Sequence, residues 1–338
     1  MTTSDTIQRA RIRSTTVTVT RLGFGAAPIG NMYAPVAEDT ALAAVDAAWQ
    51  AGIRYFDTAP HYGLGLSEQR LGRALARRPR GEFTIASKVG RLLVPNATPT
   101  GSDLANGFAV PDDLRREVDY SAAASVRGIE ESLGRLGLDR LDIALVHDPD
   151  HDVAQVVRET VPALCRLRDE GVIGAVGIGM NYWQPLEYVV RHSDVDAVMV
   201  AGRWTLLDRS AAPLLELCAE RGVAVLAAAP FNSGILAHAD PPDDATFDYA
   251  PASPGVLARA RAIAAAARAH GVEPARAALQ FPLRHPAVVA VVAGMVNATQ
   301  AHAAARWLAE PVPEDAWPDL DVALPLPDGA CSHPPEQP

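Results

Sequence analysis

Glycines that end amphipathic helices recur along the chain, and each is followed at once by a short apolar run. The pattern occurs at Ala51-Gly52-Ile53, Glu170-Gly171-Val172 and Arg221-Gly222-Val223. Glycine here supplies the left-handed backbone that stops a helix, and a short β-branched run after it is typical of a strand buried on both faces. The repeat therefore predicts parallel βα units.

Eight apolar runs are candidates for the strands of these units, and eight strands close a (β/α)8 barrel. The runs are Leu22–Ala27, Arg54–Asp57, Phe83–Val89, Leu141–His147, Val172–Gly179, Ala197–Ala201, Val223–Ala229 and Val288–Gly294. The segments between them are amphipathic, as a helix that covers a barrel must be. An open doubly wound sheet is the alternative, but it usually carries G-x-G-x-x-G after its first strand. That motif does not follow the first run, so we expect a single TIM barrel.

The flanks and insertions divide the 338 residues further. We expect residues 1–14 to be a flexible N-terminus, residues 15–309 to form the barrel, and the proline-rich residues 310–338 to form a tail that either covers the site or is partly disordered. Thr15–Thr20 alternates with valine, which predicts a β-hairpin that caps the barrel bottom.

Two segments interrupt the regular spacing of helices and strands. Gly90–Tyr120 is rich in proline, asparagine and glycine, and Asn232–Pro254 contains several prolines. Long connections of this kind are usually functional, and each follows a predicted strand. We therefore expect both to be lid loops at the top of the barrel.

Composition excludes several classes of function. Acidic side chains outnumber basic ones by 40 to 30, so no basic surface for nucleic acid is indicated. We find no apolar stretch typical of a signal peptide or a membrane span, and the odd count of three cysteines argues against a disulfide framework. The sequence predicts a cytoplasmic protein with a small-molecule partner and leaves monomer and homodimer open.

Chemically useful side chains stand where the predicted strands end. Asp57, Lys88 and His147 come at or near the ends of three consecutive strands, and Tyr62 lies five residues past Asp57. In (β/α)8 barrels the active site forms at these carboxyl ends. A carboxylate, an ammonium, an imidazole and a phenol are therefore expected to converge at one site.

These four groups suit acid/base chemistry. A tyrosine has an ordinary pKa of about 10, and a neighbouring ammonium such as Lys88 stabilises the phenolate and lowers the pKa. Asp57 would hold Lys88 as a buried ion pair, while His147 would orient a substrate oxygen toward Tyr62. None of the four carries a hydride, so a redox cofactor is needed for carbonyl/alcohol interconversion.

Three motifs around these residues resemble the aldo-keto reductase superfamily. They are Phe56–Gly63, Ser87–Arg91 and Leu145–Asp148, and the resemblance extends from about Val17 to about Leu308. It implies a barrel, a nicotinamide cofactor bound across its top, and a catalytic tetrad of Asp57, Tyr62, Lys88 and His147.

Four further segments resemble the subgroup that contains D-threo-aldose 1-dehydrogenase (L-fucose dehydrogenase) and pyridoxal 4-dehydrogenase. They are Leu64–Glu68, His147–Asp150, Ala201–Leu207 and Phe231–Leu236. This resemblance implies oxidation of a cyclic hemiacetal to a lactone with NAD(P)+. A reductase of small aldehydes or ketones is the alternative within the family.

The resemblance also implies a set of cofactor-binding residues. Asn181 would hold the nicotinamide carboxamide, the loop at 231–236 the pyrophosphate, and residues 294–300 the adenosine at a helix N-terminus, where backbone N–H groups favour phosphate. Val296 stands where NADP-dependent relatives carry Lys or Arg, which favours NAD and leaves NADP open. The full set is Ala26, Asn181, Phe231, Asn232, Gly234, Leu236, Gly294, Val296, Asn297 and Gln300.

Candidate substrate contacts are Tyr33, His61, Arg91 and Trp204. Trp204 and Phe231 are also candidates to support the nicotinamide ring, because Ala228 and Ala229 stand where relatives often carry a stacking tyrosine. For Arg91, as for Arg203, an ordinary surface pair is an equal alternative.

Two other classes of function are alternatives. One is a metal-dependent hydrolase or sugar isomerase of this fold; such a hydrolase needs His-x-His on its first strand, and the first predicted strand has no histidine, so no metal is expected. A non-catalytic subunit that senses nicotinamide stays open as a second alternative.

Overall fold

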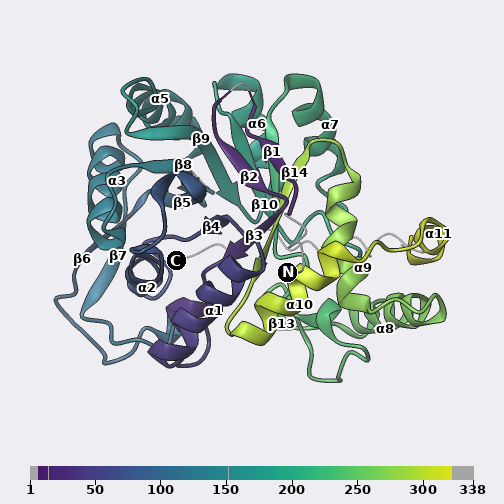
Figure 1. The fold of residues 1–338 in the computed structure, drawn as a ribbon. Coiled ribbons are helices and arrows are strands. Elements are labelled where there is room, and N and C mark those ends of the chain that lie inside the picture. Colours follow the sequence, from purple (N-terminus) through teal and green to yellow (C-terminus); the bar gives the residue numbers. More distant parts are fainter. Residues whose placement is uncertain (1–6, 14, 151, 322–338) are drawn as a thin grey trace.

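A closed barrel of eight parallel strands forms the centre of the computed structural model, which describes residues 7–13, 15–150 and 152–321 (Figure 1). The barrel strands are β3 (Leu22–Gly25), β4 (Tyr55–Asp57), β5 (Thr84–Val89), β8 (Leu141–His147), β9 (Ile173–Met180), β10 (Ala197–Ala201), β11 (Ala224–Ala228) and β14 (Val288–Gly294). They follow one another around the ring in chain order, and β14 closes it against β3 with Val291 opposite Leu22. All eight predicted runs are barrel strands, which confirms the predicted fold class.

Helices surround the barrel (Figure 1). They are α1 (Glu38–Gln50), α2 (Leu66–Leu75), α3 (Ala122–Leu136), α4 (Val153–Gln155), α5 (Val161–Asp169), α6 (Trp183–His192), α7 (Ala212–Arg221), α8 (Pro254–Ala269), α9 (Pro274–Gln280), α10 (Ala298–Ala309) and α11 (Trp317–Leu320), with a π-helical turn η4 (Val156–Thr160) between α4 and α5. Short 3-10 turns are η1 (Pro28–Gly30), η2 (Arg80–Glu82), η3 (Leu104–Asn106), η5 (Ile235–Ala237), η6 (Phe281–Arg284) and η7 (Glu314–Ala316). None of the helices in the described ranges is long and apolar enough to cross a membrane.

A hairpin of β1 (Arg9–Arg11) and β2 (Thr18–Thr20) plugs the barrel bottom. Ile12 and Val19 are fully buried and pack in one cluster with barrel residues such as Tyr55. The hairpin predicted from Thr15–Thr20 is therefore present, but its first strand lies in residues expected to be flexible. The sequence of β1 has no alternation of apolar and polar residues, because Arg9 and Arg11 are exposed and no large apolar residue lies between them. The neighbouring Ile12, which is fully buried, anchors this strand.

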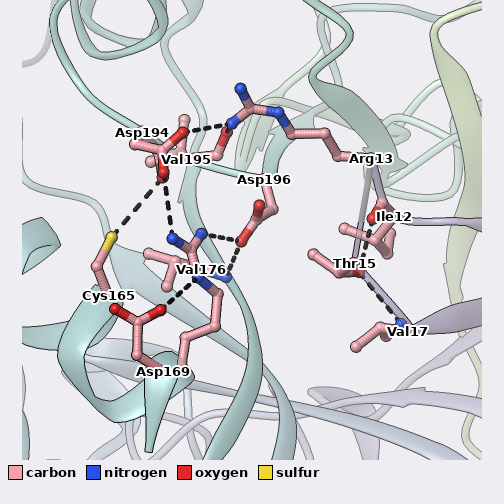
Figure 2. A network of polar contacts seen from close by, with 11 residues as sticks. Ile12, Arg13, Thr15, Val17, Cys165, Asp169, Val176, Asp194, Val195 and Asp196 are labelled. Atoms are coloured by element: carbon pink, nitrogen blue, oxygen red, sulfur yellow. Dashed lines mark hydrogen bonds and ion pairs between the residues drawn. The ribbon is translucent and has the colours of Figure 1, made fainter.

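Polar contacts tie this hairpin to the bottom of the barrel (Figure 2). The Arg13 guanidinium donates to Asp194 Oδ1 at 2.7 Å and to the Val195 carbonyl at 3.0 Å. Asp196 Oδ2 accepts from the Val176 backbone N–H at 2.9 Å and from an arginine of α5, Arg168, at 2.7 Å. The network closes the end of the barrel opposite the strand ends that hold the predicted site.

Each predicted lid contains a hairpin. Residues 90–120 include β6 (Arg91–Pro95) paired with β7 (Leu114–Val118), and residues 232–254 include η5 and the short pair β12 (Thr246–Phe247) and β13 (Ala250–Pro251). The first lid follows β5 and the second follows β11. Both lids therefore start at the carboxyl ends of barrel strands, as predicted.

The described part of the C-terminal segment packs on the outside of the barrel. Trp317 and Leu320 of α11 are buried in a cluster with residues of α8, and α11 lies at the edge of the view beside α8 (Figure 1). Residues 322–338 lie outside the described residues. The two predicted alternatives, that the tail covers the site or that it is partly disordered, therefore both stay open for those residues.

Candidate active site

Three adjacent strands bring the predicted carboxylate, ammonium and imidazole together. Asp57 and His147 are the last residues of β4 and β8, and Lys88 is the penultimate residue of β5. Asp57, Lys88 and His147 are 3%, 2% and 6% exposed, so they lie within the barrel mouth rather than on its surface. Buried charges need partners, and these are supplied locally.

The Lys88 ammonium has three acceptors. Its Nζ donates to Asp57 Oδ2 at 2.8 Å, to the Thr58 carbonyl at 2.9 Å and to the Tyr62 hydroxyl oxygen at 3.1 Å. An ammonium has three N–H groups, so these contacts satisfy it fully. The charge is thereby fixed against the phenol oxygen.

Backbone packing holds Tyr62 in this place. Gly63 has a φ of +63° and an added Cβ would lie 2.2 Å from the Gly30 carbonyl oxygen. An added Cβ on Gly30 would in turn lie 2.9 Å from the carbonyl carbon of Tyr62. Only glycine allows this close approach and this φ. The loop after β3 therefore supports the loop that carries the phenol.

Burial and charge act in opposite directions on the phenol. Burial raises the pKa of Tyr62, Lys88 lowers it and Asp57 raises it again, with a net shift above the ordinary value. Burial alone would lower the pKa of Lys88, but Asp57 and Tyr62 raise it well above its ordinary value. The prediction that Lys88 brings the pKa of Tyr62 below its ordinary value is wrong for the protein alone, because the ammonium offsets only part of the burial.

His147 is a neutral imidazole at this site. Burial lowers its pKa well below the ordinary value, and the positive charges of Lys88 and Arg91 lower it further. Its ring lies perpendicular to that of Tyr62, with centroids 5.8 Å apart. A neutral ring keeps one N–H donor and one acceptor, which suits it to hydrogen-bond a substrate oxygen.

Asp148 adjoins the tetrad but was not predicted to be a site residue. Its Oδ2 lies 3.5 Å from His147 Nε2 and accepts from an Arg91 N–H at 3.2 Å. Its φ of +43° is strained for a non-glycine residue. Burial raises the pKa of Asp148 to about 6 despite Arg91. Its position directly after His147 at a strand end was the available signal.

The predicted substrate contacts separate into two groups. The His61 ring packs against Phe108 of the first lid and against His147, with centroids 5.2 and 5.5 Å away, and burial lowers its pKa to about 2. Arg91 reaches the site through Asp148. Tyr33 stands at the rim, 57% exposed, with its backbone N–H donating to the carbonyl of Gly107.

Trp204 makes its ring and hydrogen-bond contacts outside the tetrad. Its indole N–H donates to the Pro282 carbonyl at 3.3 Å, and its ring packs against Phe281 and His285. Those residues precede β14, whereas the tetrad lies at the carboxyl ends of β4, β5 and β8. A contact of Trp204 with substrate therefore stays a prediction.

Ala26 is also placed differently from its expected role. It is fully buried, its N–H donates to the Asp57 carbonyl at 2.9 Å, and its carbonyl accepts from Ser67 Oγ at 2.8 Å. No surface remains for a cofactor to contact. Ala26 instead fixes the backbone of Asp57.

The loop expected to hold the pyrophosphate has an unusual backbone. Asn232, Ser233 and Gly234 have φ values of +44°, +58° and +96°. The Asn232 amide donates to the Gly202 carbonyl at 2.9 Å, while its buried Oδ1 has no partner within the described part of the chain. Phe231 packs edge-on against Trp307 of α10, with centroids 6.1 Å apart, and Leu236 is buried. The loop thus contacts α10 at Trp307, near the C-terminal end of that helix.

That helix begins with a reciprocal cap. Asn297 Oδ1 accepts from the Gln300 N–H at 2.9 Å, and Gln300 Oε1 accepts from the Val296 N–H at 2.8 Å. This arrangement resembles a capping box, except that the Gln300 side chain accepts from the residue before the N-cap. Gly294 is exposed beside it. The residues present fit a dinucleotide, because backbone N–H groups at an exposed helix start favour phosphate, and the unpartnered Oδ1 of Asn232 can accept from a hydroxyl or a carboxamide N–H of such a group.

The fold and these side chains define a class of protein, namely barrel oxidoreductases that use a tyrosine, a lysine, an aspartate and a histidine at the strand ends. A model of the aldo/keto reductase family matches residues 21–324. The chain therefore belongs to the aldo/keto reductase family and is an NAD(P)-dependent oxidoreductase.

Several curated relatives align over most of the chain. D-threo-aldose 1-dehydrogenase of Pseudomonas sp is 45% identical over 90% of this chain and 94% of that protein. Pyridoxal 4-dehydrogenase of Microbacterium luteolum is 36% identical over 93% of this chain and 96% of that protein. L-galactose dehydrogenase of Arabidopsis thaliana is 33% identical over 87% of this chain and 86% of that protein.

Solved structures show the same fold. Aldo-keto reductase AKR11C1 from Bacillus halodurans, in its holo form, superposes with a TM-score of 0.75 at 24% identity, covering 93% of this chain and 95% of that one. Glycerol dehydrogenase AKR11B4 from Gluconobacter oxydans also gives 0.75, at 20% identity, covering 96% and 98%. These likenesses concern the barrel alone.

Proposed function

We propose that this chain is an aldose 1-dehydrogenase that oxidises the C1 hydroxyl of a cyclic sugar hemiacetal, of the L-fucose or D-threo-aldose type, to a lactone. The observation that carries the proposal is the 3.1 Å hydrogen bond from Lys88 to the hydroxyl of Tyr62 at the barrel mouth. The 45% identity to D-threo-aldose 1-dehydrogenase supports this substrate class.

Tyr62 is the general base in this proposal. The C1 hydroxyl gives its proton to the phenolate oxygen of Tyr62. The C1–H bond breaks and its hydride passes to the hydride acceptor, so that C1 becomes the lactone carbonyl. A bound oxidised nicotinamide supplies the hydride acceptor. Because burial raises the pKa of Tyr62, the phenolate depends on the Lys88 ammonium for its stability.

The other two members of the tetrad support this step. Asp57 accepts a hydrogen bond from Lys88 at 2.8 Å and fixes the direction of the ammonium. His147, kept neutral by burial, hydrogen-bonds the C1 oxygen and directs it toward Tyr62. Water is kept away because all of these groups except Tyr62 are nearly fully buried.

The cofactor would lie between the second lid and the start of α10. Asn181 would hold the carboxamide, the Phe231–Leu236 loop the pyrophosphate, and the cap formed by Asn297 and Gln300 the adenosine end. We propose NAD rather than NADP, because Val296 offers no charge to a 2′-phosphate.

A second candidate is pyridoxal oxidation. Pyridoxal forms an internal hemiacetal through its hydroxymethyl group, so the same proton and hydride transfers would give a lactone. The 36% identity to pyridoxal 4-dehydrogenase favours this candidate over others in the family.

One experiment separates these candidates. Purified protein is incubated with NAD+ or NADP+ and with L-fucose, D-arabinose or pyridoxal, and the absorbance of reduced nicotinamide is followed. We expect turnover with a sugar and NAD+. Turnover with pyridoxal but with neither sugar would favour the second candidate. Micromolar nicotinamide binding without turnover of any substrate on the panel would favour a sensor subunit.

A further inference from the structure

The turn that follows His147 has a strained backbone that is held from both sides. Asp148 comes directly after the last residue of β8 and has a φ of +43°, a region that non-glycine residues seldom occupy. Its N–H donates to the Gly179 carbonyl of β9 at 3.0 Å. The Tyr120 hydroxyl lies 2.9 Å from the His147 carbonyl oxygen and 2.8 Å from that of Asp148, and donates to them. Strain that the surroundings maintain in this way is kept chiefly at functional sites.

Tyr120, which supports this turn, is itself fixed by its neighbours. It is 3% exposed, and its carbonyl accepts from the Thr160 hydroxyl. Gly90 follows β5 directly, and an added Cβ there would lie 2.2 Å from Cε1 of the Tyr120 ring. The position of Asp148 is therefore set by packed groups around the ends of two barrel strands, and the turn is not a free loop.

The Asp148 carboxylate lies beside the imidazole of His147. Its Oδ2 is 3.5 Å from His147 Nε2 and accepts from Arg91, the first residue of β6 in the first lid, at 3.2 Å. The Asp148 side chain is 20% exposed, so a ligand at the barrel mouth can reach it. A carboxylate is thus held next to the group that orients the substrate oxygen.

This carboxylate has acceptor capacity to spare. An ionised carboxylate can accept about four hydrogen bonds, whereas Asp148 accepts one, from Arg91, and its Oδ1 accepts none among the residues that the structure describes. Within the same residues, Nδ1 of His147 is buried without a partner, which leaves Nε2 to meet a substrate oxygen. The carboxylate beside Nε2 favours the proton on that nitrogen. A donor and a free acceptor therefore stand side by side.

We propose that Asp148 accepts a hydrogen bond from the hydroxyl group on the carbon next to the reacting carbon, so that the site selects substrates with oxygens on both carbons. This inference rests on the proposed function and names a group that recognises its substrate. His147 donates from Nε2 to the C1 oxygen, and Asp148 accepts from the C2 hydroxyl. Oxygens on neighbouring carbons of a sugar ring are separated by about one hydrogen-bond length, which suits the adjacent Nε2 and Oδ2. A 2-deoxy sugar leaves the carboxylate without its donor, and such unpaired groups disfavour an analogue.

The test compares L-fucose with 2-deoxy-L-fucose, which lacks only the C2 hydroxyl. Asp148→Gly removes the carboxylate and suits the positive φ. Burial raises the pKa of Asp148 to about 6, so assays at about pH 8 keep it ionised in the parent. We expect the parent to favour L-fucose in kcat/KM by at least about tenfold, as for a hydrogen bond to a charged group, and Asp148→Gly to reduce this preference to within about threefold.

Two further variants separate recognition of the hydroxyl from a general effect on the site. Asp148→Asn keeps a neutral acceptor oxygen and should give a preference between those of the parent and Asp148→Gly. Asp152→Asn is the matched control, because it removes a charge from the same loop at an exposed position without a capping bond, and its preference should stay within about twofold of the parent. A residue that merely shapes the site or orients His147 would affect both sugars equally. An equal fall for both sugars in Asp148→Gly, with their ratio unchanged, would overturn the inference.

Failure of the proposed function gives a different result. If the parent oxidises neither L-fucose nor D-arabinose, that function fails, and the hydroxyl preference is then measured in the reduction of lactaldehyde and propanal with NADH. These two aldehydes differ only in the hydroxyl next to the carbonyl carbon. A preference for lactaldehyde of at least about tenfold that Asp148→Gly abolishes would support the role of Asp148 without the sugar. Absence of that preference in the parent, or its persistence in the variant, would contradict it.

Discussion

The ammonium of Lys88 lies 3.1 Å from the hydroxyl oxygen of Tyr62, and both groups are enclosed by the carboxyl ends of neighbouring barrel strands. The contact places a positive charge beside the Tyr62 phenol, whose ionisation is opposed by burial. A phenol in this setting ionises only to the extent that the ammonium allows. Activity should therefore respond to every change in this pair.

Tyr62→Phe removes the proton acceptor and leaves the ring. We expect turnover to fall by at least about a hundredfold, as for loss of a general base, while the Kd of NADH stays nearly that of the parent. Steady-state rates and a fluorescence titration of NADH measure the two quantities. Rates like those of the parent protein would contradict the assignment of Tyr62.

Asp57→Asn should move the pH dependence of oxidation toward lower pH. Burial raises the pKa of Tyr62, and the negative charge of Asp57 raises it as well. Oxidation needs the phenolate, so kcat/KM rises with pH as Tyr62 loses its proton. Removal of the Asp57 charge lowers that pKa, and the rising limb then begins at lower pH.

Lys88→Met supplies the opposite case. Loss of the ammonium raises the pKa of Tyr62, so the rising limb of kcat/KM should shift to higher pH. The variant also leaves Asp57 as an uncompensated buried charge, which destabilises proteins by about 3–5 kcal/mol. The double variant Asp57→Asn with Lys88→Met should recover part of that stability in urea unfolding, and shifts of the same sign in both single variants would refute this account.

Gly63→Ala tests the backbone contact that supports Tyr62. An added Cβ would lie 2.2 Å from the Gly30 carbonyl oxygen, so we expect a loss of more than about 2 kcal/mol in unfolding free energy, above the roughly 1–2 kcal/mol that a left-handed φ alone costs. Turnover should fall too, because the phenol is displaced. Gly134→Ala is the matched control: it is exposed in α3 with open space around it, and alanine there should stabilise by about 0.5–1 kcal/mol.

Local patterns were enough to predict the barrel and the place of the tetrad. Each strand is a short apolar run with its own boundary signal, and Asp57, Lys88 and His147 are placed by where their own strands end. The bounds of β8, β10 and β14 agree with the prediction to the residue. Such features depend on neighbours in sequence, which the sequence displays directly.

Features that depend on distant partners could not be predicted in this way. An ordinary surface ion pair stayed an alternative for Arg203, because its partner Asp248 lies 45 residues later and nothing near Arg203 in the sequence indicates it. The pKa of Tyr62 depends on how much burial opposes Lys88, and only the packed site gives that balance. Trp204 was a candidate to contact substrate or support the nicotinamide ring, and only the packed structure shows its bond to the Pro282 carbonyl, 78 residues away.

Val296→Arg tests the proposed preference for NAD. Val296 stands at the start of α10, where its N–H donates to Gln300 Oε1, and an arginine there would present a guanidinium to a 2′-phosphate without losing that backbone bond. A charged hydrogen bond contributes about 1.5–3 kcal/mol, so the ratio of kcat/KM for NADP+ over NAD+ should rise by at least about tenfold. His302→Arg adds the same charge at an exposed position of α10 and should leave the ratio within about twofold. A ratio that rises equally in both variants would show that net charge, and not position 296, sets the cofactor preference.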